Sequence, residues 1–186
     1  MSNLNIILLH DDMVDKQKNI TTTSLTMIDL HDIARSTRTY GVGNTFVCHS
    51  SPSLRKLAST LKAHWMSGFG EKYNGNRKEA LTKVHIIREL DEAITFLDEK
   101  YGKLPKLIAS SAKDGGKRIS FTLMKEMINS DVNTPYLLML GTGWGMSDKL
   151  LSRADYFLEP IKGPTDYNHL SVRAACAIML DRIQGR

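Results

Sequence analysis

The stretch LLMLGTGWGMS, residues Leu137–Ser147, joins a hydrophobic run to three glycines and a serine. Gly141, Gly143 and Gly145 are spaced two apart, and Ser147 is of a type that begins helices. The spacing differs from the G-x-G-x-x-G fingerprint, which lies on the first strand of a dinucleotide-binding fold. Two interpretations are open. The glycines either allow positive φ in a strand-to-helix turn or let a nucleotide approach the backbone closely.

Strands and helices alternate along the chain around this stretch. Six strands are predicted, over Asn5–His10, Thr45–His49, Lys83–Ile87, Leu104–Ser110, Pro135–Leu140 and Tyr156–Pro160. Helices are predicted over Leu25–Tyr40, Ser51–Trp65, Asp91–Tyr101, Ser120–Asn129, from Ser147, and over His169–Ile183. The segments after the first strand and after Trp65 are interpreted as loops. Strands joined through helices predict an α/β fold with a parallel sheet of about six strands, covered by helices on both faces.

Length and composition limit the class of protein. The chain has 186 residues, of which 41% are hydrophobic and 24% charged, typical of one soluble globular domain spanning residues 1–186. A net charge of +5 modestly favours a polyanionic partner. Cys48 and Cys176 form no CxxC pair, so a reducing cytoplasm is expected. The apolar run Ile6–Leu9 is too short for a signal peptide or a membrane span.

The last predicted helix is apolar on nearly every side. Its apolar residues are Leu170, Val172, Ala174, Ala175, Ala177, Ile178, Met179, Leu180 and Ile183. Such a helix must be buried on nearly all sides, and the sheet of a small chain covers only one. We therefore expect a two-fold homodimer built around this helix.

Three consecutive loops have the composition of ligand-binding segments. SSAKDGGKR follows the fourth strand, GTGWG the fifth and EPIKGPTDYN the sixth. In open α/β sheets ligands bind beyond the carboxyl ends of the strands, so these loops predict a site together. Gly116–Lys117 does not make the first a P-loop, because the glycine five residues earlier and the following Ser or Thr are missing. His10, His49, His64 and His85 lack ligand spacing and are interpreted as structural, and no metal site is predicted.

Four stretches together make the chain similar to the SPOUT-class RNA methyltransferases, and to one bacterial branch of them over essentially its whole length. They are TSLTMIDLHDIARSTRTYGV, HWMSGFGEKYNGNRKEAL, LLMLGTGWGMS and LEPIKGPTDYNHLSVRAACAIMLDRI. The resemblance implies a C-terminal trefoil knot and S-adenosyl-L-methionine (SAM) as the cofactor, with its adenosine in the glycine loop. It also implies tRNA or rRNA as the substrate, and no DNA.

The first signature of the ribose-methylating members lies on the helix Leu25–Tyr40. Arg35 and Gly41 match it, and Asp29 stands where the family has an asparagine. Arg35 lies one position away from the apolar stripe of its helix. It is either part of a solvated basic face or a functional residue, and its match to the first signature favours a functional residue. An arginine there can bind a phosphate or stabilise charge on the methyl acceptor. Asp29 is interpreted either as a surface acid or as a group that orients Arg35.

The second and third signatures coincide with the loops after the fifth and sixth strands. The glycine loop is one residue shorter than the family's and lacks its glutamate. Pro160, Gly163 and Ser171 match the third signature in spacing, whereas Tyr167–His169 replaces its Ser-Leu-Asn run. The cofactor scaffold therefore carries over, while the methylated atom stays open between a ribose 2′-O and a base nitrogen.

The resemblance and the loops together predict the site residues. The cofactor-binding set is Ser110, Ser111, Leu140, Gly141, Thr142, Gly143, Gly145, Glu159, Pro160, Ile161, Gly163, Leu170 and Ser171. The catalytic set is Arg35, Asp29, Asp166, Asn168 and His169. A ring N–H or hydroxyl acceptor must lose a proton, which Asp166 or His169 could take. Asp166 or Asn168 could instead cap the last helix.

The stretch HWMSGFGEKYNGNRKEA mixes aromatic and basic side chains. They are Trp65, Phe69, Lys72, Tyr73, Arg77 and Lys78. This mixture suits unstacked RNA bases and phosphates, and is as common in a partly packed surface loop.

Two functions from different classes are compatible with these features. The first is SAM-dependent methylation of structured RNA. The alternative is a non-catalytic RNA-binding or ribosome-assembly module that retains a SAM pocket.

Overall fold

The computed structural model describes residues 2–111 and 118–186, and only the backbone of Gly68 and Phe69. Its strands are β1 Leu4–Leu9, β2 Met13–Val14, β3 Ile20–Thr21, β4 Thr45–Cys48, β5 Val84–Ile87, β6 Lys106–Ala109, β7 Arg118–Ile119, β8 Tyr136–Leu140 and β9 Tyr156–Leu158. Its helices are α1 Met27–Thr39, α2 Pro52–Met66, α3 Gly68–Tyr73, α4 Gly75–Leu81, α5 Leu90–Tyr101, α6 Phe121–Ser130, α7 Asp148–Leu151 and α8 Val172–Gln184.

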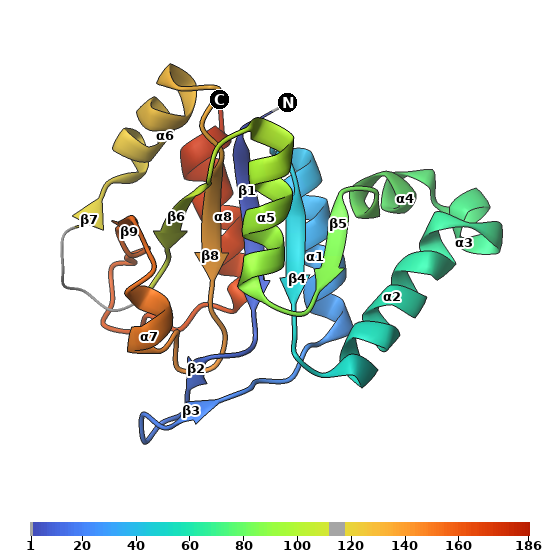
Figure 1. Cartoon of the computed structure of the whole chain (residues 1–186), viewed down its shortest axis with the longest axis horizontal. Coiled ribbons are helices and arrows are strands. Elements are labelled where there is room, and N and C mark those ends of the chain that lie inside the picture. The colour runs from blue at the N-terminus through green and yellow to red at the C-terminus, as the bar shows by residue number, and fades with distance from the viewer. Residues whose placement is uncertain (1, 112–117) are drawn as a thin grey trace.

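Among the residues that the structure describes, seven strands form one sheet in the order β5-β4-β1-β8-β6-β9-β7 (Figure 1). Every neighbouring pair in it is parallel, which confirms the predicted fold class. The predicted number of about six strands is corrected to seven. The additional strand, β7, is two residues long and pairs with β9 at the edge of the sheet. So short a segment has no alternation of its own that a sequence could reveal.

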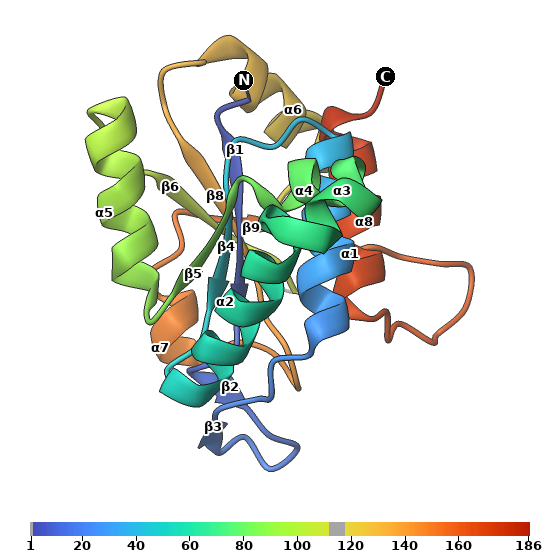
Figure 2. The ribbon, with the colours of Figure 1, turned by 90° about the vertical axis from the view of Figure 1, so that its right-hand side faces the viewer.

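Helices cover both faces of the sheet (Figure 2). One apolar cluster joins Leu4, Ile6 and Leu8 of β1 to α1, α2, α4, α6 and α8. The other joins Ile7 and Leu9 of the same strand to α5 and α7. β1 is thus buried on both faces, as a nearly continuous apolar run in a central parallel strand requires.

Two segments that the sequence predicts as loops contain regular structure. β2 and β3 pair antiparallel as a separate two-stranded ribbon. Residues 68–81, after Trp65, form the short helices α3 and α4. The helix predicted from Ser147 is only the four-residue α7, and the last helix begins at Val172 instead of His169.

The last helix is covered on its inner side only. Cys176, Met179, Leu180 and Ile183 are buried. Ala174, Ala175, Ala177 and Ile178 are partly exposed. α8 therefore has an apolar side that its own chain covers incompletely.

The two cysteines are buried and unpaired. Burial raises the pKa of the Cys48 and Cys176 thiols to about 12, so both stay protonated at neutral pH. Within residues 2–111 and 118–186, no helix has the length and apolar character needed to cross a bilayer.

Candidate functional site

The three loops predicted to form a site leave neighbouring strands at one edge of the sheet. β8, β6 and β9 are adjacent, so their carboxyl ends lie together (Figure 1). Ser110 ties the first loop to β8, because its hydroxyl donates to the Met139 carbonyl oxygen at 2.8 Å. The rest of the first loop after Ser111, residues 112–117 with the Gly116–Lys117 pair, lies outside the described residues. This edge is where open α/β sheets bind ligands.

The glycine loop after β8 needs its glycines for its own conformation. Gly143 and Gly145 have positive φ angles of 59° and 110°. A Cβ on Gly143 would lie 3.0 Å from Thr23 Cγ2, and one on Gly141 would lie 2.9 Å from Met146 Cγ. The interpretation as a turn with positive φ is therefore correct. The atoms that lie closest to the glycine backbone belong to other residues of the same chain.

The β2–β3 ribbon forms backbone hydrogen bonds with the glycine loop. The Val14 amide donates to the Gly145 carbonyl oxygen at 2.9 Å, and the Trp144 amide donates to the Val14 carbonyl oxygen at 3.2 Å. Thr142 Oγ1 donates to the Leu9 carbonyl oxygen at 3.0 Å. The segment predicted as a polar loop thus holds the glycine loop in place.

Two buried histidines lie behind the glycine loop at the ends of β1 and β4. The rings of His10 and His49 stack with their centroids 5.4 Å apart. His10 Nδ1 lies 3.1 Å from Thr23 Oγ1, which lies 2.5 Å from Thr142 Oγ1. Burial, and next the charge of His49, lowers the pKa of His10 to about 4. A neutral imidazole therefore takes part in holding Thr23 and the glycine loop together.

Stability should fall as the pH is lowered from 6.5 to about 4. In this interval the unfolded chain binds a proton at His10 and the folded protein does not, so protons favour unfolding. The shift in pKa corresponds to at most about 3–4 kcal/mol of unfolding free energy. Urea unfolding across this interval should show the loss, and His10→Asn should reduce its slope. An unchanged slope in the variant would assign the effect to other groups.

The loop after β9 caps two helices. Glu159 Oε1 accepts a hydrogen bond from the first amide of α6 at 2.7 Å. Ser171 Oγ accepts one from the third amide of α8 at 3.2 Å. The interpretation of Asp166 or Asn168 as the cap is therefore wrong, because the helix starts later in the chain than predicted.

Between these two caps the loop is open to solvent. Gly163, Asp166, His169 and Leu170 are exposed, and Pro160, Ile161 and Asn168 are half-buried. The ring of Tyr167 meets the ring of His169 edge to face, with centroids 5.2 Å apart. A substrate can therefore reach the Asp166 carboxylate and the His169 imidazole.

Asp29 is buried in the first turn of α1 and pairs with α8. Arg173 Nη1 donates to Asp29 Oδ1 at 2.5 Å, and Thr26 Oγ1 donates to Asp29 Oδ2 at 2.5 Å. Both interpretations of Asp29 are corrected, because it is neither a surface acid nor a partner of Arg35. The ion pair joins positions 144 apart, which helical spacing cannot reveal.

Breaking this ion pair should destabilise the protein, and more so when the arginine is removed. The Asp29 side chain is 8% exposed and the Arg173 side chain 31%. Arg173→Leu leaves a carboxylate that water hardly reaches, at a cost of about 3 kcal/mol, and Asp29→Asn should cost about half as much. Urea unfolding measures both. Arg38→Ala, which breaks an exposed pair with Glu79, is the control and should cost less than about 1 kcal/mol. Equal losses in all three would contradict this account.

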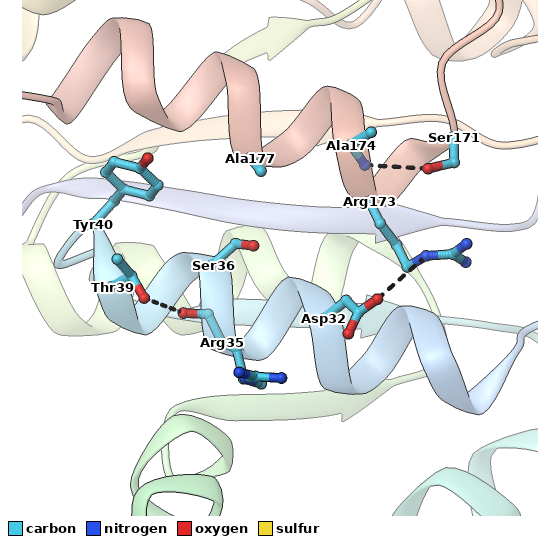
Figure 3. Close-up of a pocket in the computed structure, with 9 residues that line it drawn as sticks. All are labelled: Asp32, Arg35, Ser36, Thr39, Tyr40, Ser171, Arg173, Ala174 and Ala177. Carbon is cyan, nitrogen blue, oxygen red and sulfur yellow. Dashed lines mark hydrogen bonds and ion pairs between the residues drawn. The ribbon is translucent and has the colours of Figure 1, made fainter.

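Arg35 lies on the exposed surface of α1. Its side chain points away from α8 (Figure 3) and makes no ion pair with another described residue. It lines one side of a hollow of about 520 Å³ between α1 and α8, together with Ser171 and Arg173. A predicted catalytic residue and a predicted cofactor residue thus share one surface of the same chain.

The glycine loop has groups that fit the adenosine part of SAM. Gly143 is exposed, and its amide and carbonyl form no hydrogen bond with another described residue. Without a Cβ beside them, both groups can pair with the edge of an adenine, which presents donors and acceptors. Ile161, half-buried after β9, adds apolar surface.

Comparisons with known proteins agree with this geometry. A family described as “SAM-dependent RNA methyltransferase” matches residues 3–185. The chain is 38% identical over 183 residues to a tRNA (guanine-N(1)-)-methyltransferase of Nitratidesulfovibrio vulgaris and 36% identical to that of Oleidesulfovibrio alaskensis, covering 98% of this chain each time. It spans only 42% of the length of each of these relatives.

A solved structure supports the fold. It is the SpoU methyltransferase AviRb of Streptomyces viridochromogenes in complex with the cofactor AdoMet, with a TM-score of 0.60 and 13% identity. The match covers 98% of this chain and 57% of that one. At this identity the likeness concerns the fold, which is that of a SpoU methyltransferase.

Proposed function

Because this chain belongs to the SAM-dependent RNA methyltransferase family, we propose that it transfers the methyl group of SAM to structured RNA, in the cytoplasm. The observation that carries the proposal is that the segments after β8, β6 and β9 leave adjacent parallel strands at their carboxyl ends. The glycine loop offers backbone groups to adenosine, and exposed side chains after β9 face solvent on the same edge.

The names of the relatives do not determine which RNA atom accepts the methyl group. Their names describe whole proteins, and more than half of each lies outside the part that matches this chain. Modification of guanine N1 can reside in that other part. We therefore propose tRNA or rRNA as the substrate, with a base nitrogen and a ribose 2′-O as the two acceptor classes.

Within this proposal the charged residues have separate roles. Arg35 binds a phosphate of the RNA or stabilises the negative charge that develops on the acceptor. Asp166 or His169, both exposed in the loop before α8, takes the proton that the acceptor loses. The predicted SAM-binding residues, from Ser110 to Ser171, hold the methyl donor. Asp29 acts only through the packing of α1 on α8.

We also propose a two-fold homodimer that buries the partly exposed side of α8; the trefoil knot stays a prediction. Ala174 and Ala177 line the hollow between α1 and α8. Ala174→Glu or Ala177→Glu should give monomers or aggregates in light scattering, because each places an unpaired charge in the interface. Ala63→Glu, at an exposed alanine of α2, is the control and should leave the dimer intact. A wild-type protein that is monomeric at micromolar concentration would contradict the dimer.

The experiment that tests the function is mass spectrometry of nucleosides from cells with and without this protein. One methylated nucleoside should disappear from tRNA or rRNA, and purified protein with SAM should restore it. The identity of that nucleoside names the acceptor atom. Unchanged nucleosides, together with RNA binding by the purified protein, would replace the enzyme by the non-catalytic alternative.

A further inference from the structure

The net positive charge of this protein arises from one segment. Between Ser51 and Lys83 the sequence has seven lysines and arginines and two glutamates, a net charge of +5. The other residues have 18 lysines and arginines and 18 acidic residues, so they balance. The segment comprises α2, α3 and α4, which pack beside α1 on one side of the sheet (Figure 2).

The two glutamates of this segment are both neutralised locally. Glu71 pairs with Lys78, and Glu79 pairs with Arg38 of α1. The acids therefore do not oppose the remaining basic side chains. Lys72, which is exposed on α3, and Arg77 on α4 form no ion pair with another described residue.

The guanidinium of Arg77 lies over an aromatic ring. Its guanidinium carbon lies 4.2 Å from the centre of the Trp65 ring. The ring lies on one side of the guanidinium, whose N–H groups form no hydrogen bond with another described residue. A planar guanidinium with a free edge suits bidentate binding of a phosphate.

Arg35 and Arg77 both act on the charge of His31. The His31 ring meets the Trp65 ring edge to face at 5.9 Å. Burial lowers the pKa of His31, and the charges of Arg77 and Arg35 lower it further, against Asp32. Both arginines therefore lie near one imidazole, although one is on α1 and the other on α4. Arg35 also lines the hollow between α1 and α8, to which Ser171 contributes from the other side.

We propose that Arg35, Trp65, Lys72 and Arg77 form a surface, the α1–α4 basic face, that binds the phosphate backbone of the substrate RNA. This inference rests on the proposed function and adds the place where the RNA docks. Closely spaced phosphates match several cations that lack anionic partners. Tyr73, 74% exposed beside Lys72, gives an unpaired base a ring on which to stack, which favours RNA over an acidic protein.

The test measures the affinity of purified protein for a short fluorescent RNA hairpin by anisotropy, over a range of salt concentrations. Arg77→Gln and, separately, Lys72→Gln should each weaken binding about tenfold at low salt. Each should also lower the slope of log affinity against log salt by about 0.7–0.9. Lys72 is exposed, so its variant stays informative even if Arg77→Gln perturbs folding.

Lys103→Gln is the matched control, because it removes one exposed charge directly after α5, which covers the other face of the sheet from α2, α3 and α4 (Figure 2). It should change the affinity less than twofold. Equal losses in the control and the test variants would overturn the α1–α4 basic face, and so would unchanged binding in both test variants. Competition by polyglutamate as effective as that by RNA of equal charge would assign the face to an acidic protein and overturn the RNA proposal.

These experiments distinguish a wrong docking surface from a wrong function. Wild-type protein that methylates RNA, with test variants that bind it normally, would contradict the docking surface and leave the function standing. Wild-type protein that binds RNA through this face without methylating any RNA would contradict the function alone.

Discussion

Gly143→Val should abolish binding of SAM while the protein stays folded. Position 143 has a φ of 59°, which a β-branched residue rarely adopts, and its Cβ would meet Thr23 Cγ2 at 3.0 Å. The strain of about 1–3 kcal/mol would shift the loop, and the new side chain would cover the amide and carbonyl of residue 143. Calorimetry should show wild-type affinity in the micromolar range, roughly −8 kcal/mol, and no measurable heat for the variant.

Gly102→Val is the matched control for this experiment. Gly102 has nearly the same φ, 68°, but a Cβ there meets nothing within 4 Å. It follows α5 at the opposite edge of the sheet from the glycine loop. The control should lose similar stability and still bind SAM and S-adenosylhomocysteine. If both variants lost SAM binding equally, global destabilisation would explain the result. Tight binding of NAD but not of SAM by the wild type would refute the cofactor assignment.

Arg35→Ala should reduce methyl transfer to the true RNA by about two to three orders of magnitude. Losing one group that stabilises charge in the transition state typically costs about 2.7–4 kcal/mol. SAM affinity should stay within a few-fold, because Arg35 lies on α1, outside the loops after β6, β8 and β9. Arg35→Lys should recover little activity, because an ammonium lacks the planar fork of a guanidinium. Single-turnover rates with saturating SAM measure this effect.

Mixing two inactive variants tests whether Arg35 serves the site of its partner. In a two-fold dimer with shared sites, Arg35→Ala and Gly143→Val subunits combine to give one site with both lesions and one with neither. Activity should then return on mixing. No recovery, with heterodimers confirmed by native mass spectrometry, would show that Arg35 acts within its own chain or has no catalytic role. The hollow that Arg35 shares with Ser171 makes action within one chain the alternative to exclude.

Local sequence determined the elements of this protein and the edge on which the site lies. Each predicted strand and helix is present, because the apolar runs and caps that define them are contiguous. Ser51 and Pro52 begin α2 as their types predict. The positive φ of the glycine loop also follows from residue type alone, and so do three loops at the carboxyl ends of parallel strands.

Tertiary structure decided the features that depend on distant partners. The order of the seven strands and the short strand β7 depend on pairing across the sheet. The β2–β3 ribbon is held by backbone hydrogen bonds to the glycine loop, which lies far along the chain. Asp29 forms an ion pair with Arg173 of α8, and Arg35 of α1 and Arg77 of α4 both lower the pKa of His31. Such contacts form between residues that packing brings together, so no local spacing carries a signal for them.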